Sequence, residues 1–181
     1  MITSLKYTHA DLMVMPDDGK RREIIDGELY VTPSPVTGHQ RIVGNLAFAF
    51  WKFLEVHPLG ELLVSPLDVI LSEYDALEPD LLFVLNEHQD FLQDWVRGAP
   101  DLVVEILSPS TEARDRGIKL KAYARYGVGE YWIVDPVAQM IEVYRLAAEG
   151  FHVAATCAKG NTVETPLLPG FSLAVGLIFK P

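Results

Sequence analysis

A glutamate interrupts an apolar segment of the sequence, DLVVEILSPST, at residues 101–111. Aliphatic residues stand on both sides of Glu105, and this pattern is typical of a buried strand. A carboxylate in such a strand is costly unless it is paired, protonated or bound to a metal ion. The sequence therefore predicts that Glu105 has a chemical partner inside the fold.

Two aspartates are candidates for the partner of Glu105. Asp101 shares a strand face with Glu105, but four residues at about 3.3 Å each separate the two by roughly 13 Å. Metal–oxygen bonds are only about 2.0–2.6 Å long, so Asp101 and Glu105 cannot share one small cation. Asp80 begins another apolar segment, EPDLLFVL, and neighbouring strands lie about 4.8 Å apart. Asp80 is therefore the expected partner, and the pair is expected to hold a divalent ion.

A phosphate-cleaving site also benefits from a cation beside the carboxylates. Leu107 shares the strand face of Glu105, so the strand has no cationic side chain at the next position on that face. The following segment, RDRGIKLKAYAR, predicts a helix in which Asp115 and Lys119 share one face. Lys121 lies about 200° around the helix from Lys119, so only one of the two lysines can point toward the sheet. We expect that lysine to be Lys119.

The composition limits the class of protein. The chain has 181 residues, 49% of them hydrophobic and 22% charged, which favours one globular domain over residues 1–181. Cys157 is the one cysteine, so neither an internal disulfide nor a thiolate metal site is expected. The sequence has neither a long apolar run nor a basic leader, and we expect a cytoplasmic protein without a membrane partner.

The formal net charge of −10 opposes non-specific binding to nucleic acid. The positive charge is nevertheless concentrated: five of the fifteen Lys and Arg residues lie between Arg114 and Arg125, and residues 20–22 form a second cluster. A local basic face is one interpretation of these clusters. An ordinary solvated helix face is the other.

Hydrophobic periodicity and turn residues predict an α/β fold with a mixed sheet and a helix on at least one face. Capping boxes at Thr8–Asp11 and Thr37–Gln40 predict two helix starts, and Asp26-Gly27 predicts the tight turn of a hairpin. Further helices are expected over residues 39–56, 87–97 and from Thr111 or Asp115 to 126. Strands are expected over residues 22–25, 28–31, 61–72, 78–86, 101–107, 130–135, 139–146 and 151–158.

Several blocks of the sequence, in this order, resemble a known group of nucleases: REIIDGELYVTPSP, HQRIVGNL, EPDLLFV and GAPDLVVEILSPSTEARDRGIKLKAYARYGVGEYWIVDP. The chain is similar to the restriction-endonuclease-like, or PD-(D/E)XK, superfamily, and within it to the small single-domain bacterial branch described as putative restriction endonucleases. The resemblance covers nearly the whole chain. It implies a restriction-endonuclease-like mixed β-sheet flanked by α-helices, with N-terminal and C-terminal β-hairpin additions.

The resemblance also implies roles for individual residues. Asp80 matches the motif aspartate and Glu105 the motif glutamate, so both are expected to hold the metal. Leu107 stands where the superfamily usually has its lysine, and Lys119 matches the lysine that this branch carries on the following helix. Glu23 matches an acid of the first hairpin near the metal. The expected catalytic residues are thus Asp80, Glu105, Lys119 and Glu23.

These observations predict a nuclease that depends on Mg²⁺, with Mn²⁺ as a substitute, because carboxylates without a Cys–His cluster suit hard cations. The expected substrate is nucleic acid, most simply DNA, cut as an endonuclease. Arg114, Arg116 and Lys121 are expected on the approach of the DNA, and His39 is expected to contact the substrate. A homodimer would enlarge the basic face.

Two other classes of function fit the same residues. A catalytically inactive module that binds nucleic acid or a protein would agree with Leu107 and with the acidic net charge. A hydrolase of small phosphodiesters would use the same site without salt-dependent affinity for DNA.

Overall fold

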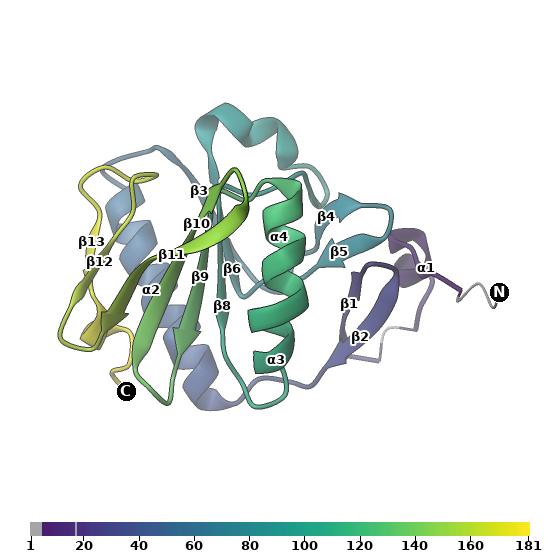
Figure 1. The fold of residues 1–181 in the computed structure, drawn as a ribbon, viewed down its shortest axis with the longest axis horizontal. Helices are drawn as coiled ribbons and strands as arrows, with labels where there is room; N and C mark the ends of the chain where they lie inside the picture. Colours follow the sequence, from purple (N-terminus) through teal and green to yellow (C-terminus); the bar gives the residue numbers. More distant parts are fainter. Residues whose placement is uncertain (1–4, 17) are drawn as a thin grey trace.

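Two apolar segments of the sequence become neighbouring strands of a six-stranded sheet in the computed structural model, which describes residues 5–16 and 18–181 (Figure 1). The strand order is β11-β10-β9-β8-β6-β3. Strands β8 and β9 are parallel and the other pairs are antiparallel, so the sheet is mixed, as predicted. The strands are β3 (Gly60–Val64), β6 (Leu81–Leu85), β8 (Leu102–Ile106), β9 (Glu130–Asp135), β10 (Met140–Ala147) and β11 (Gly150–Ala158).

A long helix, α2 (Thr37–Leu54), covers one face of this sheet. Its residues Ile42, Leu46 and Phe50 are buried in one core with Trp132 of β9, which explains the helical spacing of the apolar residues in this segment.

A composite helix over residues 112–126 covers the opposite face of the sheet (Figure 1). It consists of α3 (Glu112–Arg114), a π turn (Asp115–Lys119) and α4 (Leu120–Tyr126). Gly127 ends it with φ 91°, a left-handed conformation that suits glycine at this position. The π turn, which the sequence did not predict, is wider than an α turn, and it buries both Asp115 and Lys119.

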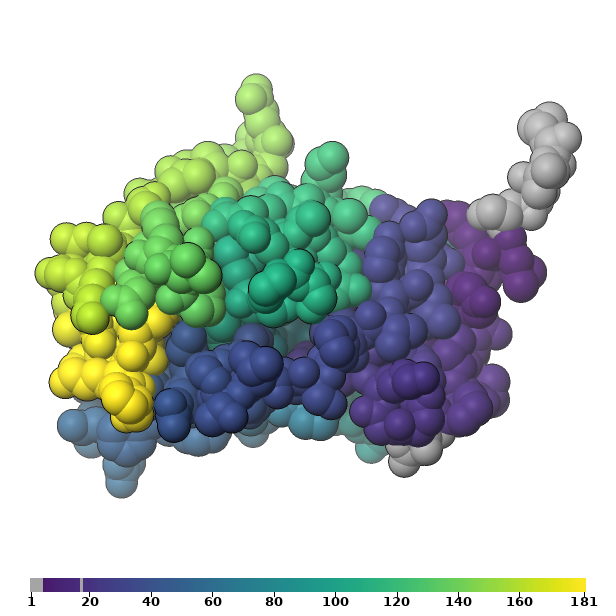
Figure 2. All heavy atoms as spheres, turned by 90° about the horizontal axis from the view of Figure 1, so that it is seen from below, coloured from purple at the N-terminus to yellow at the C-terminus, as the bar shows by residue number. Residues whose placement is uncertain are grey.

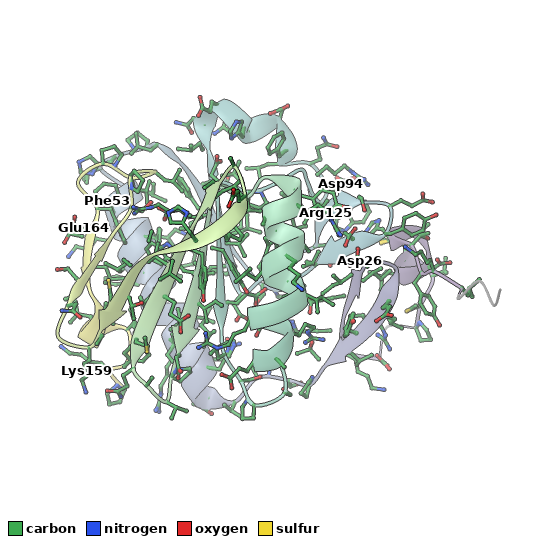
Figure 3. All side chains as sticks on the ribbon, in the orientation of Figure 1. Asp26, Phe53, Asp94, Arg125, Lys159 and Glu164 are labelled. Carbon is green, nitrogen blue, oxygen red and sulfur yellow. The ribbon has the colours of Figure 1, made fainter. Side chains whose placement is uncertain are left out.

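A second sheet, of five strands, lies beside α4 and has the order β2-β1-β5-β4-β7. The predicted N-terminal hairpin forms its edge: Asp26 (φ 53°) and Gly27 (φ 80°) make the tight turn. Arg125 of α4 reaches this turn, with Nη1 2.8 Å from Oδ1 of Asp26 (Figure 3). The strands are β1 (Arg21–Ile25), β2 (Glu28–Thr32), β4 (Val69–Ser72), β5 (Asp75–Leu77) and β7 (Val96–Arg97).

The two ends of the described chain add smaller elements. Near the N-terminus, α1 (His9–Met13) begins with the predicted capping box of Thr8 and Asp11. The C-terminal hairpin pairs β12 (Thr162–Glu164) with β13 (Ser172–Ala174), and a 3₁₀ turn (Val175–Leu177) follows. None of the helices in the described part of the chain has the length and apolarity that a membrane span requires.

Three local predictions were wrong. Thr37 and Gln40 form no capping box, because the helix begins one residue earlier with Val36 as its N-cap, without a side-chain hydrogen bond. The expected strand 61–72 is two strands in different sheets, interrupted at Pro66, which has no N–H for a ladder. The expected helix 87–97 is a 3₁₀ turn (Asn86–Phe91) followed by β7.

Candidate active site

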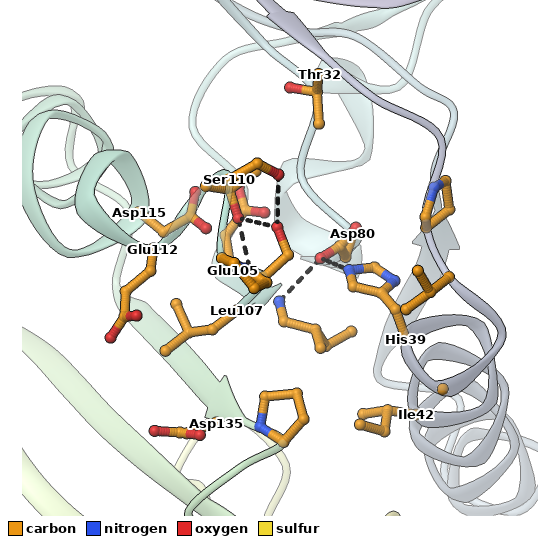
Figure 4. A pocket seen from close by; sticks show the side chains of 18 of the residues that line it. Thr32, His39, Ile42, Asp80, Glu105, Leu107, Ser110, Glu112, Asp115 and Asp135 are labelled. Carbon is orange, nitrogen blue, oxygen red and sulfur yellow. Dashed lines mark hydrogen bonds and ion pairs between the residues drawn. The ribbon is translucent and has the colours of Figure 1, made fainter.

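A cavity of about 890 Å³ opens at the end of β8, between the first turn of α2 and α3. Figure 2 looks at this end of the molecule, where the surface is hollowed between the two helices. Glu105 and Asp80 lie inside the cavity (Figure 4). Much of its wall comes from four chain segments: residues 32–36, 108–112, 135–139 without Ala138, and 178–181.

The strand register brings Asp80 and Glu105 together. Leu81 of β6 pairs with Val104 of β8, so the residues one step further along, Asp80 and Glu105, come opposite each other. The Asp80 carboxylate also reaches the neighbouring strand, since Oδ2 accepts a hydrogen bond from the backbone N–H of Ile106 at 2.8 Å. The structure thus places the two carboxylates side by side on one face of the sheet.

Lys119 reaches Glu105 from the composite helix. Its ammonium donates a hydrogen bond to Oε1 of Glu105 at 2.8 Å, lies 2.6 Å from Oε1 of Glu23 and 3.6 Å from Oδ1 of Asp115. The Lys119 side chain is buried. Burial would lower the pKa of Lys119, but the charges of Glu105, Glu23 and Asp115 outweigh it and raise this pKa, so the amine is held as a cation.

For Glu105, in contrast to Lys119, the effect of burial on the pKa is larger than that of the neighbouring cation. Burial raises its pKa well above the usual value, the Lys119 charge opposes this, and the charges of Asp115 and Asp80 add to the rise. The Tyr123 hydroxyl also donates to Oε1 of Glu105, at 3.1 Å. The Tyr123 side chain is buried. Its hydroxyl position was not predicted.

Glu23 enters the site from the second sheet. It is buried at the middle of β1, and Oε1 accepts the backbone N–H of Glu78 at 3.0 Å. Its other oxygen lies 3.7 Å from Nη2 of Arg114. Both oxygens of Glu23 therefore already face a cationic or N–H group.

Asp80 is held by His39 and Arg21 in addition to the Ile106 N–H. Nε2 of His39 lies 3.1 Å from Oδ2 of Asp80 (Figure 4), and Nη1 of Arg21 lies 3.6 Å from Oδ1. Burial raises the pKa of Asp80, but the contact with His39, the Ile106 N–H and the charge of Arg21 together lower it. Asp80 is the more readily ionised carboxylate of the pair.

Arg21 and Glu78 also belong to the site, although neither was predicted as a site residue. Nε of Arg21 donates to Oε1 of Glu78 at 2.7 Å, and Nη2 donates to the Glu78 carbonyl oxygen at 2.9 Å. A signal was present, because Arg21 and Glu78 stand two residues before Glu23 and Asp80, a spacing that puts strand side chains on one face. What the sequence alone did not show was that β1 and the segment between β5 and β6 meet.

The site carries more negative than positive charge. Five acidic side chains and three basic ones are in contact around the cavity, which leaves a formal charge of about −2 when all are ionised. Burial raises the pKa of both Glu78 and Asp115; the charge of Arg21 opposes the rise in Glu78 and that of Lys119 the rise in Asp115, and the charge of Glu23 adds to both. The acids are Glu23, Glu78, Asp80, Glu105 and Asp115, and the bases are Arg21, Arg114 and Lys119.

The other predicted substrate residues lie in different places. Arg114 lines the cavity and donates to Oγ1 of Thr32 at 2.7 Å. Arg116 does not line the cavity; its Nη1 is held 2.9 Å from Oε2 of Glu142. Lys121 is exposed on the outer side of the helix and does not line the cavity either.

The donor set of the cavity suits a hard cation that keeps part of its water. Both hydrogen bonds of Glu105 end on Oε1, and those of Asp80 end on Oδ2. Within residues 5–16 and 18–181, one oxygen of each carboxylate thus accepts no hydrogen bond. The same residues contain no group of three or more His, Cys, Asp or Glu side chains that could enclose a metal. Mg²⁺ is commonly bound through one or two carboxylates, water and phosphate, which agrees with this pair.

Comparisons with known proteins agree with the fold. Residues 9–176 match the model of the Uma2 family, described as "Putative restriction endonuclease". An uncharacterized protein of Synechocystis sp. is 26% identical over 165 residues, which cover 89% of this chain and 84% of that protein. The crystal structure of a putative nuclease from Anabaena variabilis is 18% identical with a TM-score of 0.79, covering 95% of this chain and 97% of that one.

Proposed function

We propose that this chain, which belongs to the Uma2 family of putative restriction endonucleases, is a divalent-metal-dependent nuclease that cleaves phosphodiester bonds in DNA. The observation that carries the proposal is the buried ammonium of Lys119, shared by Glu105 and Glu23 beside the Asp80 carboxylate. Two carboxylates of adjacent strands can hold a divalent ion, and a fixed cation can offset the charge that develops on the phosphate, so the three groups together fit metal-assisted hydrolysis of a phosphodiester.

Each residue of the site has a separate task in this proposal. Asp80 and Glu105 would hold Mg²⁺ or Mn²⁺ with the oxygens that accept no hydrogen bond. When bound there, the ion would act as a Lewis acid that polarises the scissile phosphate. Lys119, whose raised pKa keeps it protonated, stabilises the negative charge that develops on the phosphoryl oxygens and orients the attacking water. Glu23 holds the Lys119 ammonium in place from the opposite side.

Cleavage of supercoiled and linear DNA with and without Mg²⁺ tests the proposal. We expect cleavage that stops on addition of a chelator and falls by at least about 100-fold in Glu105→Ala, since the supports of metal ligands alone are commonly worth about 10–100-fold and this variant removes a ligand itself. Lys119→Met should also lower the cleavage rate, because it removes the cation of the site. Lys121→Met is its matched control and should leave the rate unchanged, because Lys121 lies on the same helix but is exposed. Unchanged activity in Glu105→Ala would exclude the assignment.

A homodimer is a further part of the proposal. Two copies related by a two-fold axis would bring two cavities to one nucleic acid and double the number of cationic side chains near it. Sedimentation or light scattering at the assay concentration measures this. A monomer under those conditions would contradict it.

A second candidate function is that of an inactive binding module. It is favoured by the pairing of Arg21, Arg114 and Lys119 with carboxylates, together with the net charge of −10. Titration with Mn²⁺ followed by DNA binding separates the two functions. Metal-dependent binding without cleavage of any nucleic acid would favour the module.

A further inference from the structure

The proposed catalytic groups lie at the bottom of the cavity and not on an open surface. Glu23, Asp80 and Glu105 are at most 4% exposed, and Lys119 is 3% exposed. A scissile phosphate must therefore enter the cavity to meet them. A duplex is a stiff rod with a persistence length of about 50 nm, so its phosphates enter a recess only after the DNA has been deformed.

Several exposed side chains that line the cavity are apolar and stand beside polar ones such as Ser34, Ser110 and Glu112, whereas a duplex-binding surface would be mainly basic. Val36 is 72% exposed and Val137 is 95% exposed, and both line the cavity together with Phe179. Prolines of the surrounding segments add further apolar surface: Pro33, Pro35, Pro109, Pro136 and Pro181. Apolar and aromatic groups at such a place match unstacked bases, which a duplex does not present.

The cavity also offers few cations for phosphates. Of the basic side chains that line it, Arg21, Arg114 and Lys119 already contact carboxylates. Arg41 and Lys180 line the cavity without an ion pair to any side chain in the described part of the chain. Two such cations suit a contact of one or two nucleotides, whereas proteins that bind a duplex commonly neutralise about 6–10 phosphates.

We infer that the substrate of this site is an unpaired segment of DNA, which threads into the cavity with its bases against the apolar mouth. The inference rests on the proposed nuclease function and narrows its substrate class. A single strand is narrow and flexible, so its phosphate reaches the buried carboxylates without bending a duplex. Arg41 and Lys180, which lie on the α2 side of the cavity, then meet phosphates next to the scissile one.

Cleavage of three labelled substrates of one sequence tests the inference: a single strand, the intact duplex, and the duplex with a central unpaired bubble. With Mg²⁺ and the full chain, we expect kcat/KM for the single strand and the bubble to exceed that for the duplex at least tenfold. Cuts in the bubble substrate should fall inside the bubble. Equal or faster cleavage of the intact duplex would overturn the inference but not the nuclease function, whereas no metal-dependent cleavage of any substrate would overturn both.

The dependence of single-strand binding on salt is a second readout. Two phosphate contacts predict a slope of log K against log salt of about −1.4, and Arg41→Gln should reduce its size by about 0.7. A slope of about −5 or steeper would indicate a duplex-sized contact and overturn the inference.

A third test compares two variants that each add a negative charge, one at the mouth of the cavity and one elsewhere on the surface. Val137→Asp should raise KM for the single strand severalfold with little change in kcat, because Val137 touches the bases and not the reacting phosphate. Val153→Asp is the control, since Val153 is exposed on β11 and does not line the cavity. Equal effects of the two substitutions would contradict the role of the mouth.

Discussion

The ammonium of Lys119 lies 2.8 Å from Oε1 of Glu105, although the two residues are 14 positions apart and belong to a helix and a strand. Both side chains are buried, and each changes the pKa of the other: Glu105 raises that of Lys119, and Lys119 opposes the rise that burial causes in Glu105. The stability of the fold and the proposed chemistry therefore depend on the same contact.

Removing only one partner of this pair should destabilise the protein more than removing both. Lys119→Met leaves the buried Glu105 carboxylate without its cation, and the loss of one partner of a buried ion pair commonly lowers the free energy of unfolding by about 3–5 kcal/mol. Protonation of Glu105 would reduce this loss, because the neutral acid needs no cation. The double variant Lys119→Met/Glu105→Gln should regain part of that stability and stay inactive. Urea unfolding and the DNA cleavage assay measure the two effects.

Lys121→Met is the control for this cycle, because Lys121 is exposed on the same helix and its replacement should change stability by less than about 0.5 kcal/mol. Additive effects of the two substitutions at 105 and 119 would show that the contact contributes no coupling energy.

Metal affinity should distinguish Glu105 and Asp80 from Glu23. Glu105 and Asp80 lie opposite each other on adjacent strands, whereas Glu23 lies in the other sheet with Oε1 2.6 Å from the Lys119 ammonium and hydrogen-bonded to the Glu78 N–H. Glu105→Gln and Asp80→Asn should weaken Mn²⁺ binding at least about tenfold in calorimetry, because ligands and their immediate support commonly contribute this much. Glu23→Gln should weaken it much less. If Glu23→Gln has the largest effect, the assignment of the ligands is wrong.

The sequence was sufficient for features that depend on neighbouring residues. The Asp26-Gly27 turn and the capping box of Thr8 and Asp11 are local, and both were predicted correctly. The start of α2 at Thr37 was not predicted, because its N-cap, Val36, has no side chain that can form the hydrogen bond by which a cap is recognised in a sequence.

Features that depend on distant residues were predicted only in part. The choice of Asp80 as the neighbour of Glu105 followed from strand spacing, and the register brings the two together. Arg21 was missed because its partner Glu78 is 57 residues away in the chain. The π turn at 115–119 was missed because no residue pattern marks it.

Acid should weaken the attachment of the second sheet through Asp75. Burial raises the pKa of Asp75, but the Asp26 N–H, the hydroxyls of Tyr126 and Ser72 and the Arg125 charge together lower it below 3.8. A depressed carboxylate pKa contributes stability that is fully present above the unfolded value and is lost as pH falls through the folded one. Asp75→Asn should therefore destabilise the protein by about 1–3 kcal/mol at neutral pH.

The difference between wild type and Asp75→Asn should shrink below pH 3.8 in unfolding experiments across this range. Asp94→Asn is a suitable control, because Asp94 is exposed (Figure 3). A constant difference down to pH 2 would mean that Asp75 acts by packing and not by charge.

His39 should act on metal affinity by fixing the orientation of the Asp80 carboxylate. Its Nε2 lies 3.1 Å from Oδ2 of Asp80, and the hydrogen-bonded supports of metal ligands are commonly worth about 10–100-fold in affinity. His39→Ala should weaken Mn²⁺ binding within that range, and His39→Gln, which can still donate to Asp80, should restore part of it. His57→Ala is the matched control, since His57 is exposed beyond the other end of α2. If His39→Ala raised only KM for DNA and left Mn²⁺ affinity unchanged, His39 would instead contact the substrate directly, as the sequence first suggested.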